Sequence, residues 1–154
     1  MQIVVGVSSS LEVDFVKSFL RDDFPVRLIQ NATYDVMNNV DLALVTSGTA
    51  TLETGYFQTP MIVVYKTSWL TYVIGRLLIR IKNIGLVNIV AGQKIVPELI
   101  QSNVTPQKLS ARASSVLSDK ALQENMRSAL SVIKKKLGTS GASAKVADAI
   151  MALA

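Results

Sequence analysis

The sequence predicts a parallel α/β fold of three layers, in which a central sheet carries helices on both faces and further helices follow at the C-terminal end. Two observations predict it. Short aliphatic runs alternate with segments of helical periodicity through roughly the first 66 residues, and roughly the last fifty carry helical periodicity alone. Strands that alternate with helices through short loops form right-handed crossovers, which make a sheet parallel. A chain of 154 residues can bury one such core.

The N-terminal segment predicts a strand, a helix and a second strand. Gln2 to Val7 is a nearly continuous aliphatic run, typical of a parallel strand covered on both faces. We expect Ser8 to Ser10 to cap a helix, which the sequence Asp22 to Pro25 ends. Val26 to Gln30 then predicts the second strand. The expected helix has apolar residues at helical spacing: Val13, Val16, Phe19 and Leu20.

The middle of the chain continues this alternation and then changes character. Residues 31–37 predict a loop with a short helix, Asp41 to Thr46 a third strand, and Met61 to Lys66 a fourth strand after an intervening helix. The next segments are expected to be less regular. They are a helix over Ser68 to Ile81, an irregular apolar segment over Ile84 to Gly92, and a short helix over Val96 to Gln101.

Three helices are predicted for the C-terminal part of the chain. They are Thr105 to Leu117, Asp119 to Leu137, and Ser143 to Leu153. Thr105 is expected to be an N-cap with proline at the first helical position. The lysine run Lys134 to Lys136 falls near the end of the second of these helices. At that position the run is more typical of solvated lysines that stabilise the helix dipole than of a patch that binds nucleic acid.

The junction between the third strand and the next helix is the strongest candidate for a binding site. Ser47, Gly48 and Thr49 lie where backbone N–H groups are left unpaired at the positive end of a helix dipole, which suits phosphate oxygens. Glu53 follows one turn later, where a carboxylate can accept both ribose hydroxyls. The alternatives are ordinary strand-to-helix turn chemistry for the loop, and an acid that stabilises the helix dipole for Glu53.

Composition restricts the chemistry and the partners. The chain has no histidine and no cysteine, so a general base or a metal site would need carboxylates alone. The absence of cysteine fits a cytoplasmic protein, and the N-terminal segment does not resemble a secretory signal. The net charge of +5 indicates anionic partners.

The helix expected around Trp69 to Lys82 has two interpretations. Its apolar run is interrupted by Arg76 and Arg80 and does not reach the ~18–20 residues of a membrane span. One interpretation is a core helix whose arginines reach water. The other is an interfacial helix against anionic lipid, with aromatic residues at the headgroup level. The same surface could also support a homodimer.

Several blocks of the sequence together resemble the C-terminal half of the lipid A disaccharide synthase family. The Ser-Gly-Thr-x-x-x-Glu pattern by itself is shared by many glycosyltransferases of the two-domain GT-B architecture. The coupling of the block at Asn88 to Val-Pro-Glu-Leu is more specific to this family. The blocks occur in the family's order and are Asp41 to Glu53, Pro60 to Tyr65, Leu70 to Tyr72, Asn88 to Gly92, Val96 to Gln101 and Thr105-Pro106.

The resemblance implies a Rossmann-like domain that is half of a GT-B fold, with residues 1–154 as the C-terminal nucleotide-sugar-binding domain. It implies transfer of 2,3-diacylglucosamine from UDP to 2,3-diacylglucosamine 1-phosphate, with release of UDP, at the cytoplasmic face of the inner membrane of a Gram-negative bacterium. No metal or cofactor is implied, and no nucleic acid. The resemblance implies that the loop Ser47, Gly48 and Thr49 is the diphosphate seat, with Ala50 and Thr51 as further binding residues beside it. It implies that Glu53 is the ribose ligand and that Asn88 is a polar position needed for activity. Glu98 and Gln101 lie in the adjoining block and are implied to bind the donor as well.

The sequence departs from the family pattern in what precedes Met1. The family has an N-terminal domain with much of the acceptor site and the general base, and a first C-domain strand that ends in a Gly-Ser-Arg loop. Met1 falls where the second C-domain strand begins, so this chain is expected to be inactive by itself. The alternatives are the C-terminal domain of another UDP-sugar enzyme, such as the peptidoglycan glucosaminyltransferase or a nucleotide-sugar epimerase, and a non-catalytic module that binds a membrane or a partner.

Overall fold

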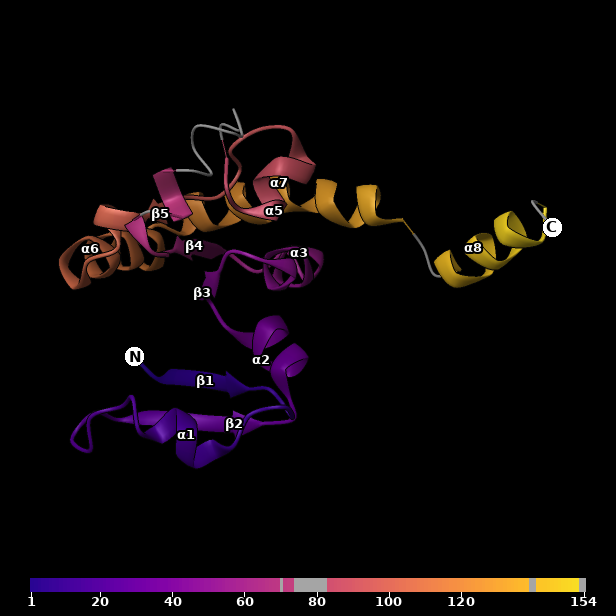
Figure 1. Cartoon of the computed structure of the whole chain (residues 1–154). Helices are drawn as coiled ribbons and strands as arrows, with labels where there is room; N and C mark the ends of the chain where they lie inside the picture. Colours follow the sequence, from indigo (N-terminus) through magenta and orange to yellow (C-terminus); the bar gives the residue numbers. More distant parts are fainter. Residues whose placement is uncertain (70, 74–82, 139–140, 153–154) are drawn as a thin grey trace.

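The computed structural model describes residues 1–69, 71–73, 83–138 and 141–152, and it confirms an α/β fold with parallel strands and flanking helices (Figure 1). The strands are β1 (Ile3–Val7), β2 (Val26–Gln30), β3 (Ala43–Thr46), β4 (Met61–Tyr65) and β5 (Glu98–Ile100). The helices are α1 (Val13–Lys17), α2 (Thr33–Asn39), α3 (Thr49–Tyr56), α5 (Leu86–Ala91), α6 (Pro106–Ser118), α7 (Lys120–Leu137), α8 (Ala142–Met151) and the short 3-10 helix η1 (Gln101–Asn103).

Every strand pair in the described residues is parallel, but the strands form two sheets and not the single sheet that the sequence predicts. β1 pairs with β2, with Ile3 opposite Val26. β3, β4 and β5 form the second sheet in that order, with Ala43 opposite Met61 and Val63 opposite Glu98. The predicted strands over 2–7, 26–30, 41–46 and 61–66 are all present, with ends that differ by at most two residues.

The hydrophobic core belongs to the second sheet. Helices α3 and α5 both pack on α7, so the core lies between the sheet and these helices. Gly55 of α3 permits this packing, because a Cβ there would lie 3.2 Å from a methyl group of Val87 and 3.4 Å from one of Ile133. The buried cluster comprises Val45, Met61, Val63, Val87, Val96, Val116, Met126, Leu130 and Ile133.

Two predictions on either side of residue 95 were wrong. The segment expected to be irregular, Ile84 to Gly92, contains helix α5, which ends at a left-handed Gly92 whose N–H bonds the carbonyls of Asn88 and Ile89. Its β-branched residues disfavour a helix locally, but Val87 and Asn88 are fully buried, so tertiary packing stabilises it. The segment Val96 to Gln101 was expected to be a helix. It contains the strand β5 instead, because its backbone pairs with β4.

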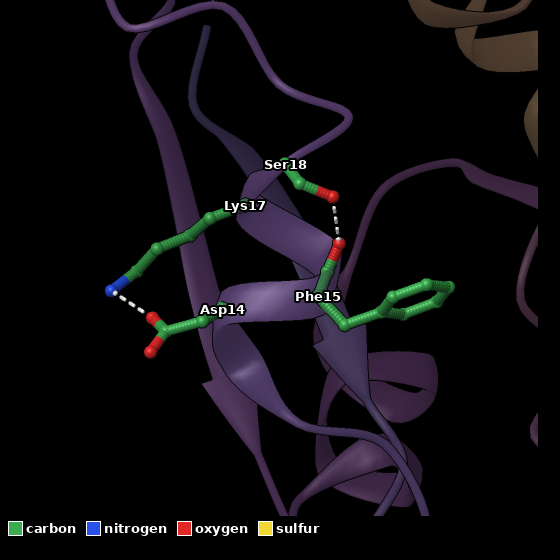
Figure 2. Close-up of polar contacts among 4 residues, drawn as sticks. All are labelled: Asp14, Phe15, Lys17 and Ser18. Atoms are coloured by element: carbon green, nitrogen blue, oxygen red, sulfur yellow. Dashed lines mark hydrogen bonds and ion pairs between the residues drawn. The ribbon is translucent and has the colours of Figure 1, made fainter.

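Helix α1 is shorter than the sequence predicts, and Ser8 to Ser10 do not cap it. The helix covers only Val13–Lys17, and its N-cap is Glu12, whose side chain makes no capping bond. Figure 2 shows that Lys17 Nζ donates to the Asp14 carboxylate at 3.1 Å and that the Ser18 hydroxyl donates to the Phe15 carbonyl at 2.7 Å. The serine bond satisfies a terminal carbonyl and helps to end the helix. Of the apolar residues that the sequence places at helical spacing, Phe19 is exposed, and Val13, Val16 and Leu20 are only half-buried.

The predicted C-terminal helices are present as α6, α7 and α8. Thr105 is the N-cap of α6, accepting a hydrogen bond from the N–H of Lys108, with proline at the first position as predicted. The lysine run at the end of α7 has defined contacts. Lys136 Nζ donates to the Val90 carbonyl at 2.7 Å, near the C-terminus of α5, and Lys134 Nζ lies 5.1 Å from the centre of the Tyr56 ring.

The helix predicted over Ser68 to Ile81 lies mostly outside the described residues, and so does most of the Trp69 to Lys82 surface. Trp69 itself is described, and its side chain is exposed. None of the helices in the described part of the chain has the length and apolar character needed to cross a bilayer.

Candidate functional site

The loop between β3 and α3 has the backbone geometry of a site that a ligand can approach closely. Gly48 is the N-cap of α3, with φ 157° and ψ −167°, a combination that essentially only glycine adopts. Among the described residues, no atom would lie within 4 Å of a Cβ built on Gly48. Glycine is therefore needed here for the backbone conformation, and the space beside it is open.

Helix α3 begins with amides that are not used by the rest of the described chain. The N–H of Thr51 bonds the Gly48 carbonyl, and the N–H of Ser47 bonds Val64 in the sheet. For the N–H groups of Gly48, Thr49 and Ala50, the described residues supply no acceptor, and no side chain caps the helix. Thr49 is exposed, and Gly48 and Ala50 are half-buried. These three amides lie at the positive end of the helix dipole.

Glu98, the first residue of β5, holds the segment that leads into α5. Its Oε1 accepts the N–H of Gly85 at 2.9 Å, and its Oε2 accepts the N–H of Ile84 at 3.0 Å. Because Gly85 is the N-cap of α5, the carboxylate lies at the positive end of that helix. The start of α5 is thus occupied by an acid of the protein itself.

Asn88 on α5 is fully buried and makes four hydrogen bonds with its side chain. Its oxygen accepts the N–H groups of Ile95 and Val96, at 2.8 and 3.0 Å. Its Nδ2 donates to the Val96 carbonyl at 3.0 Å and to Glu98 Oε1 at 2.7 Å. The amide is therefore saturated by protein groups, and its strongest contact is to a charged acceptor.

Ser47 and Thr51 join this network to the β3–α3 loop. The Ser47 hydroxyl donates to the Ile84 carbonyl at 2.9 Å. The Thr51 hydroxyl donates to the Gly48 carbonyl at 2.8 Å and accepts the N–H of Val87 at 3.3 Å. Thr51 is fully buried, so its side chain faces the core and not the open side of the loop. We call the residues Ser47, Gly48, Thr51, Ile84, Gly85, Asn88 and Glu98 the loop network.

Four predicted site residues lie outside the loop network: Thr49 and Ala50, whose backbone amides begin α3, and Glu53 and Gln101. Glu53 is half-buried on α3, one turn beyond Thr49, and its carboxylate makes no hydrogen bond or ion pair within the described residues. Gln101 is the first residue of η1, directly after β5, and its Oε1 accepts the N–H of Thr67 at 2.7 Å while its Nε2 donates to the Thr67 carbonyl at 3.0 Å. Its amide thus continues the β4–β5 pairing beyond the last strand residue.

Comparison with known proteins identifies the family. Residues 2–151 match the family model described as lipid-A-disaccharide synthetase. The chain belongs to this family. It is 42% identical over 155 residues to the lipid-A-disaccharide synthase of Syntrophus aciditrophicus (strain SB), with 99% of this chain covered. It is 40% identical over 152 residues to the enzyme of Anaeromyxobacter sp. (strain K) and 39% identical over 152 residues to that of Geobacter sulfurreducens.

The chain spans 40% of the length of each of these relatives, while the alignments cover 97% to 99% of the chain itself. The family resemblance drawn from the sequence blocks is therefore confirmed over nearly the whole chain. The remaining 60% of each relative's length is not matched by this chain.

Sequence reasoning missed the part that residues 84 and 85 play. Their backbone connects Ser47 to Glu98, so they position the β3–α3 loop without contributing a functional side chain. The sequence feature that reflects this role is the glycine at position 85. A Cβ there would lie 3.1 Å from Glu98 Oε1 and 3.2 Å from a methyl group of Val63, so a larger residue would crowd both. The described residues bring no three acidic side chains together in a way that could hold a metal ion.

Proposed function

We propose that this chain is the UDP-sugar-binding part of a lipid-A-disaccharide synthase. The reaction would be transfer of 2,3-diacylglucosamine from UDP to 2,3-diacylglucosamine 1-phosphate, with UDP as the leaving group. One observation carries the proposal: the three unused amides at the start of α3, in a chain of this family. The rest of the acceptor site, and the base that activates the acceptor hydroxyl, would come from polypeptide beyond these 154 residues.

The contrast between the two helix starts supports α3 as the diphosphate seat. At α5, Glu98 and the Thr51 hydroxyl already accept the N–H groups of Ile84, Gly85 and Val87. At α3, Gly48 leaves the approach open, and within the described part of the chain no carboxylate caps the first amides. Helix N-terminal amides stabilise anions, and they would stabilise the charge that develops on departing UDP without moving during the reaction.

Glu53 and Asn88 would have different roles. Glu53 has an unused carboxylate on the same helix as the amides, so we propose that it accepts the ribose hydroxyls. Asn88 is buried and saturated, so we propose that it acts through Glu98 and the loop network as a positioning residue. Thr51 would position Gly48 in the same way, through its bond to the glycine carbonyl.

The substrates would bring the protein to a membrane surface. Both proposed substrates carry acyl chains, so we propose a peripheral location on the cytoplasmic face of the inner membrane. An exposed Trp69 and a net charge of +5 are consistent with anionic lipid headgroups.

Replacing Gly48 by alanine is expected to weaken UDP binding at least about tenfold. The loop must leave its present conformation, because an L-residue held there costs about 1–3 kcal/mol, and about 1.4 kcal/mol corresponds to tenfold in affinity. Isothermal titration of UDP into the chain measures the effect. Gly92→Ala is the matched control, since Gly92 also has positive φ and open space but lies at the far end of α5. Equal UDP affinity in the two variants would contradict the proposed seat.

Replacing Glu53 by alanine is expected to lower UDP affinity by about ten- to a hundredfold, since hydrogen bonds to a charged group contribute about 1.5–3 kcal/mol. The free energy of unfolding should change by less than about 0.5 kcal/mol, because the carboxylate has no partner among the described residues. Glu124→Ala on the exposed face of α7 is the control and should leave UDP binding unchanged. A deoxyribose analogue of UDP should lose affinity for the parent chain but not for the variant, and an unchanged UDP affinity in Glu53→Ala would refute the ribose role.

A further inference from the structure

Four hydroxyl side chains lie within the β3–α3 loop and the helix that follows it. Ser47 belongs to the loop, and Thr49, Thr51 and Thr54 belong to α3. A hydroxyl has one proton, so it can donate one hydrogen bond, although it can accept two. The oxygens of an ionised diphosphate only accept hydrogen bonds. A hydroxyl can therefore donate to a diphosphate only if its proton is not already used within the protein.

Three of these four protons are used by backbone carbonyls. The Ser47 hydroxyl donates to the Ile84 carbonyl at 2.9 Å. The Thr51 hydroxyl donates to the Gly48 carbonyl at 2.8 Å, and the Thr54 hydroxyl donates at 2.8 Å to the carbonyl four residues before it. A carbonyl has no proton, so the direction of each bond is fixed. None of the three hydroxyls can donate to a ligand without giving up its bond within the protein.

Thr49 is the exception among the four. Its side chain is exposed, and its hydroxyl makes no hydrogen bond within the described residues. It is the first residue of α3 and lies between Gly48 and Ala50, whose N–H groups also have no acceptor in the described chain. The available hydroxyl proton of this segment is thus located among the unused amides.

Ser47 is bonded through both its backbone and its side chain. Its N–H donates to the Val64 carbonyl of β4 at 3.0 Å, while its hydroxyl is bonded to Ile84. Ile84 is held at its other end as well, because its N–H donates to Glu98 Oε2 at 3.0 Å. Ser47 therefore links the end of the β3–β4 pairing to the segment that leads into α5.

The bonds on either side of Gly48 fix the peptide that carries its unused N–H. Ser47 precedes it and is held by β4 and Ile84. Thr51 follows it, and its N–H and hydroxyl bond the Gly48 carbonyl at 3.1 and 2.8 Å. Donors that are fixed before a charge develops stabilise that charge without a cost of reorganisation. Loss of the Ser47 hydroxyl should therefore loosen the loop without removing a group that contacts the ligand.

We propose that Ser47 is a positioning residue, which holds the β3–α3 loop through the Ile84 carbonyl, and that Thr49 is the residue among the four whose hydroxyl donates to the diphosphate. This division of roles rests on the proposed function, because the diphosphate must lie at the start of α3. It differs from the expectation drawn from the sequence, which gave Ser47 and Thr49 the same role.

The first test is a titration, followed by NMR, that compares UDP with uridine, which has no phosphate. Thr49→Val keeps the shape of the side chain and should lower UDP affinity about ten- to a hundredfold, with uridine affinity unchanged. Thr49→Ser restores a hydroxyl and should restore UDP binding. Thr33→Val is the matched control, since Thr33 is the first residue of α2 and its hydroxyl makes no hydrogen bond in the described part of the chain. Unchanged UDP affinity in Thr49→Val would overturn the proposal.

The second test distinguishes positioning from direct contact in the protein without ligand. Ser47→Ala should weaken UDP binding, and it should also speed amide exchange at Ile84 and Gly85 at least about tenfold. Thr49→Val should leave both exchange rates unchanged. Ser118→Ala is the control and should alter neither measurement, because its hydroxyl also donates to a carbonyl, at 2.8 Å, but on α6. Weaker UDP binding in Ser47→Ala with unchanged exchange would make Ser47 a direct ligand, against the proposal.

A double-mutant cycle provides the third test. Ser47 and Glu98 bond the carbonyl and the N–H of Ile84, so Glu98→Gln loosens the segment that Ser47 also holds. Ser47→Ala should then reduce UDP affinity by a factor at least about twofold smaller in the Glu98→Gln background than in the parent chain. Thr49→Val should reduce it by the same factor in both backgrounds. Independent effects of Ser47 and Glu98 would contradict the positioning role.

The titrations also separate this division of roles from the proposed function. If the parent chain bound UDP no more tightly than uridine, both would fail, because no diphosphate would be held at α3. If the parent chain bound UDP more tightly than uridine and Thr49→Val did so equally, only the division of roles would fail.

Discussion

Replacing Asn88 by alanine is expected to destabilise the chain by about 3–5 kcal/mol. The side chain is fully buried and makes four hydrogen bonds. Its loss leaves the N–H and the carbonyl of Val96 buried without the Asn88 partner, and the N–H of half-buried Ile95 loses its partner too; each buried unpaired group costs about 1–3 kcal/mol. Urea unfolding followed by circular dichroism measures the change in the free energy of unfolding.

Two further variants define what Asn88 contributes. Asn39→Ala removes an exposed side chain that makes one bond, to the Asp35 carbonyl, and should cost less than about 0.5 kcal/mol. Asn88→Asp keeps an acceptor for the two N–H groups but places a second carboxylate against Glu98, now 2.7 Å from the amide nitrogen. Because like charges repel at this distance, the aspartate variant should not restore stability at neutral pH. If Asn88→Ala cost no more than Asn39→Ala, the positioning role would be excluded.

Replacing Glu98 by glutamine is expected to cost about 2–3 kcal/mol. Three donors converge on the two carboxylate oxygens, from Ile84, Gly85 and Asn88. Glutamine has one acceptor oxygen, so its NH₂ group must face at least one N–H donor. The segment at residues 84 and 85 should then loosen, and with it the contact from Ser47 that holds the β3–α3 loop.

Two measurements test the Glu98 prediction. The free energy of unfolding from urea titration should fall by the stated amount, and amide exchange at Ile84 and Gly85 should speed up more than exchange at core amides such as Val63. Glu12→Gln is the control, because Glu12 is exposed and its side chain makes no capping bond. UDP affinity should fall in Glu98→Gln but not in Glu12→Gln. Unchanged stability together with unchanged exchange at residues 84 and 85 would contradict the role given to this carboxylate.

Local patterns were sufficient to predict the elements with strong local signals. The strand over Val26 to Gln30 and the Thr105 cap with its following proline have the predicted bounds, because alternation, capping and proline geometry act over a few residues. Residues 84–101 were misassigned for the converse reason. The short helix α5 and the short strand β5 depend on contacts with α7 and β4, which no window of the sequence contains.

The sequence by itself determined the parallel α/β class, the family and the glycine-led start of α3, because these depend on periodicity, block order and a residue type that the backbone demands. Only the tertiary structure decided that Asn88 faces Glu98 inside the protein, that Thr51 is buried while Glu53 has no partner among the described residues, and that the described strands form two parallel sheets. The physical reason is that a buried polar group is stable only with partners, and those partners are supplied by segments distant in the chain that folding alone brings together.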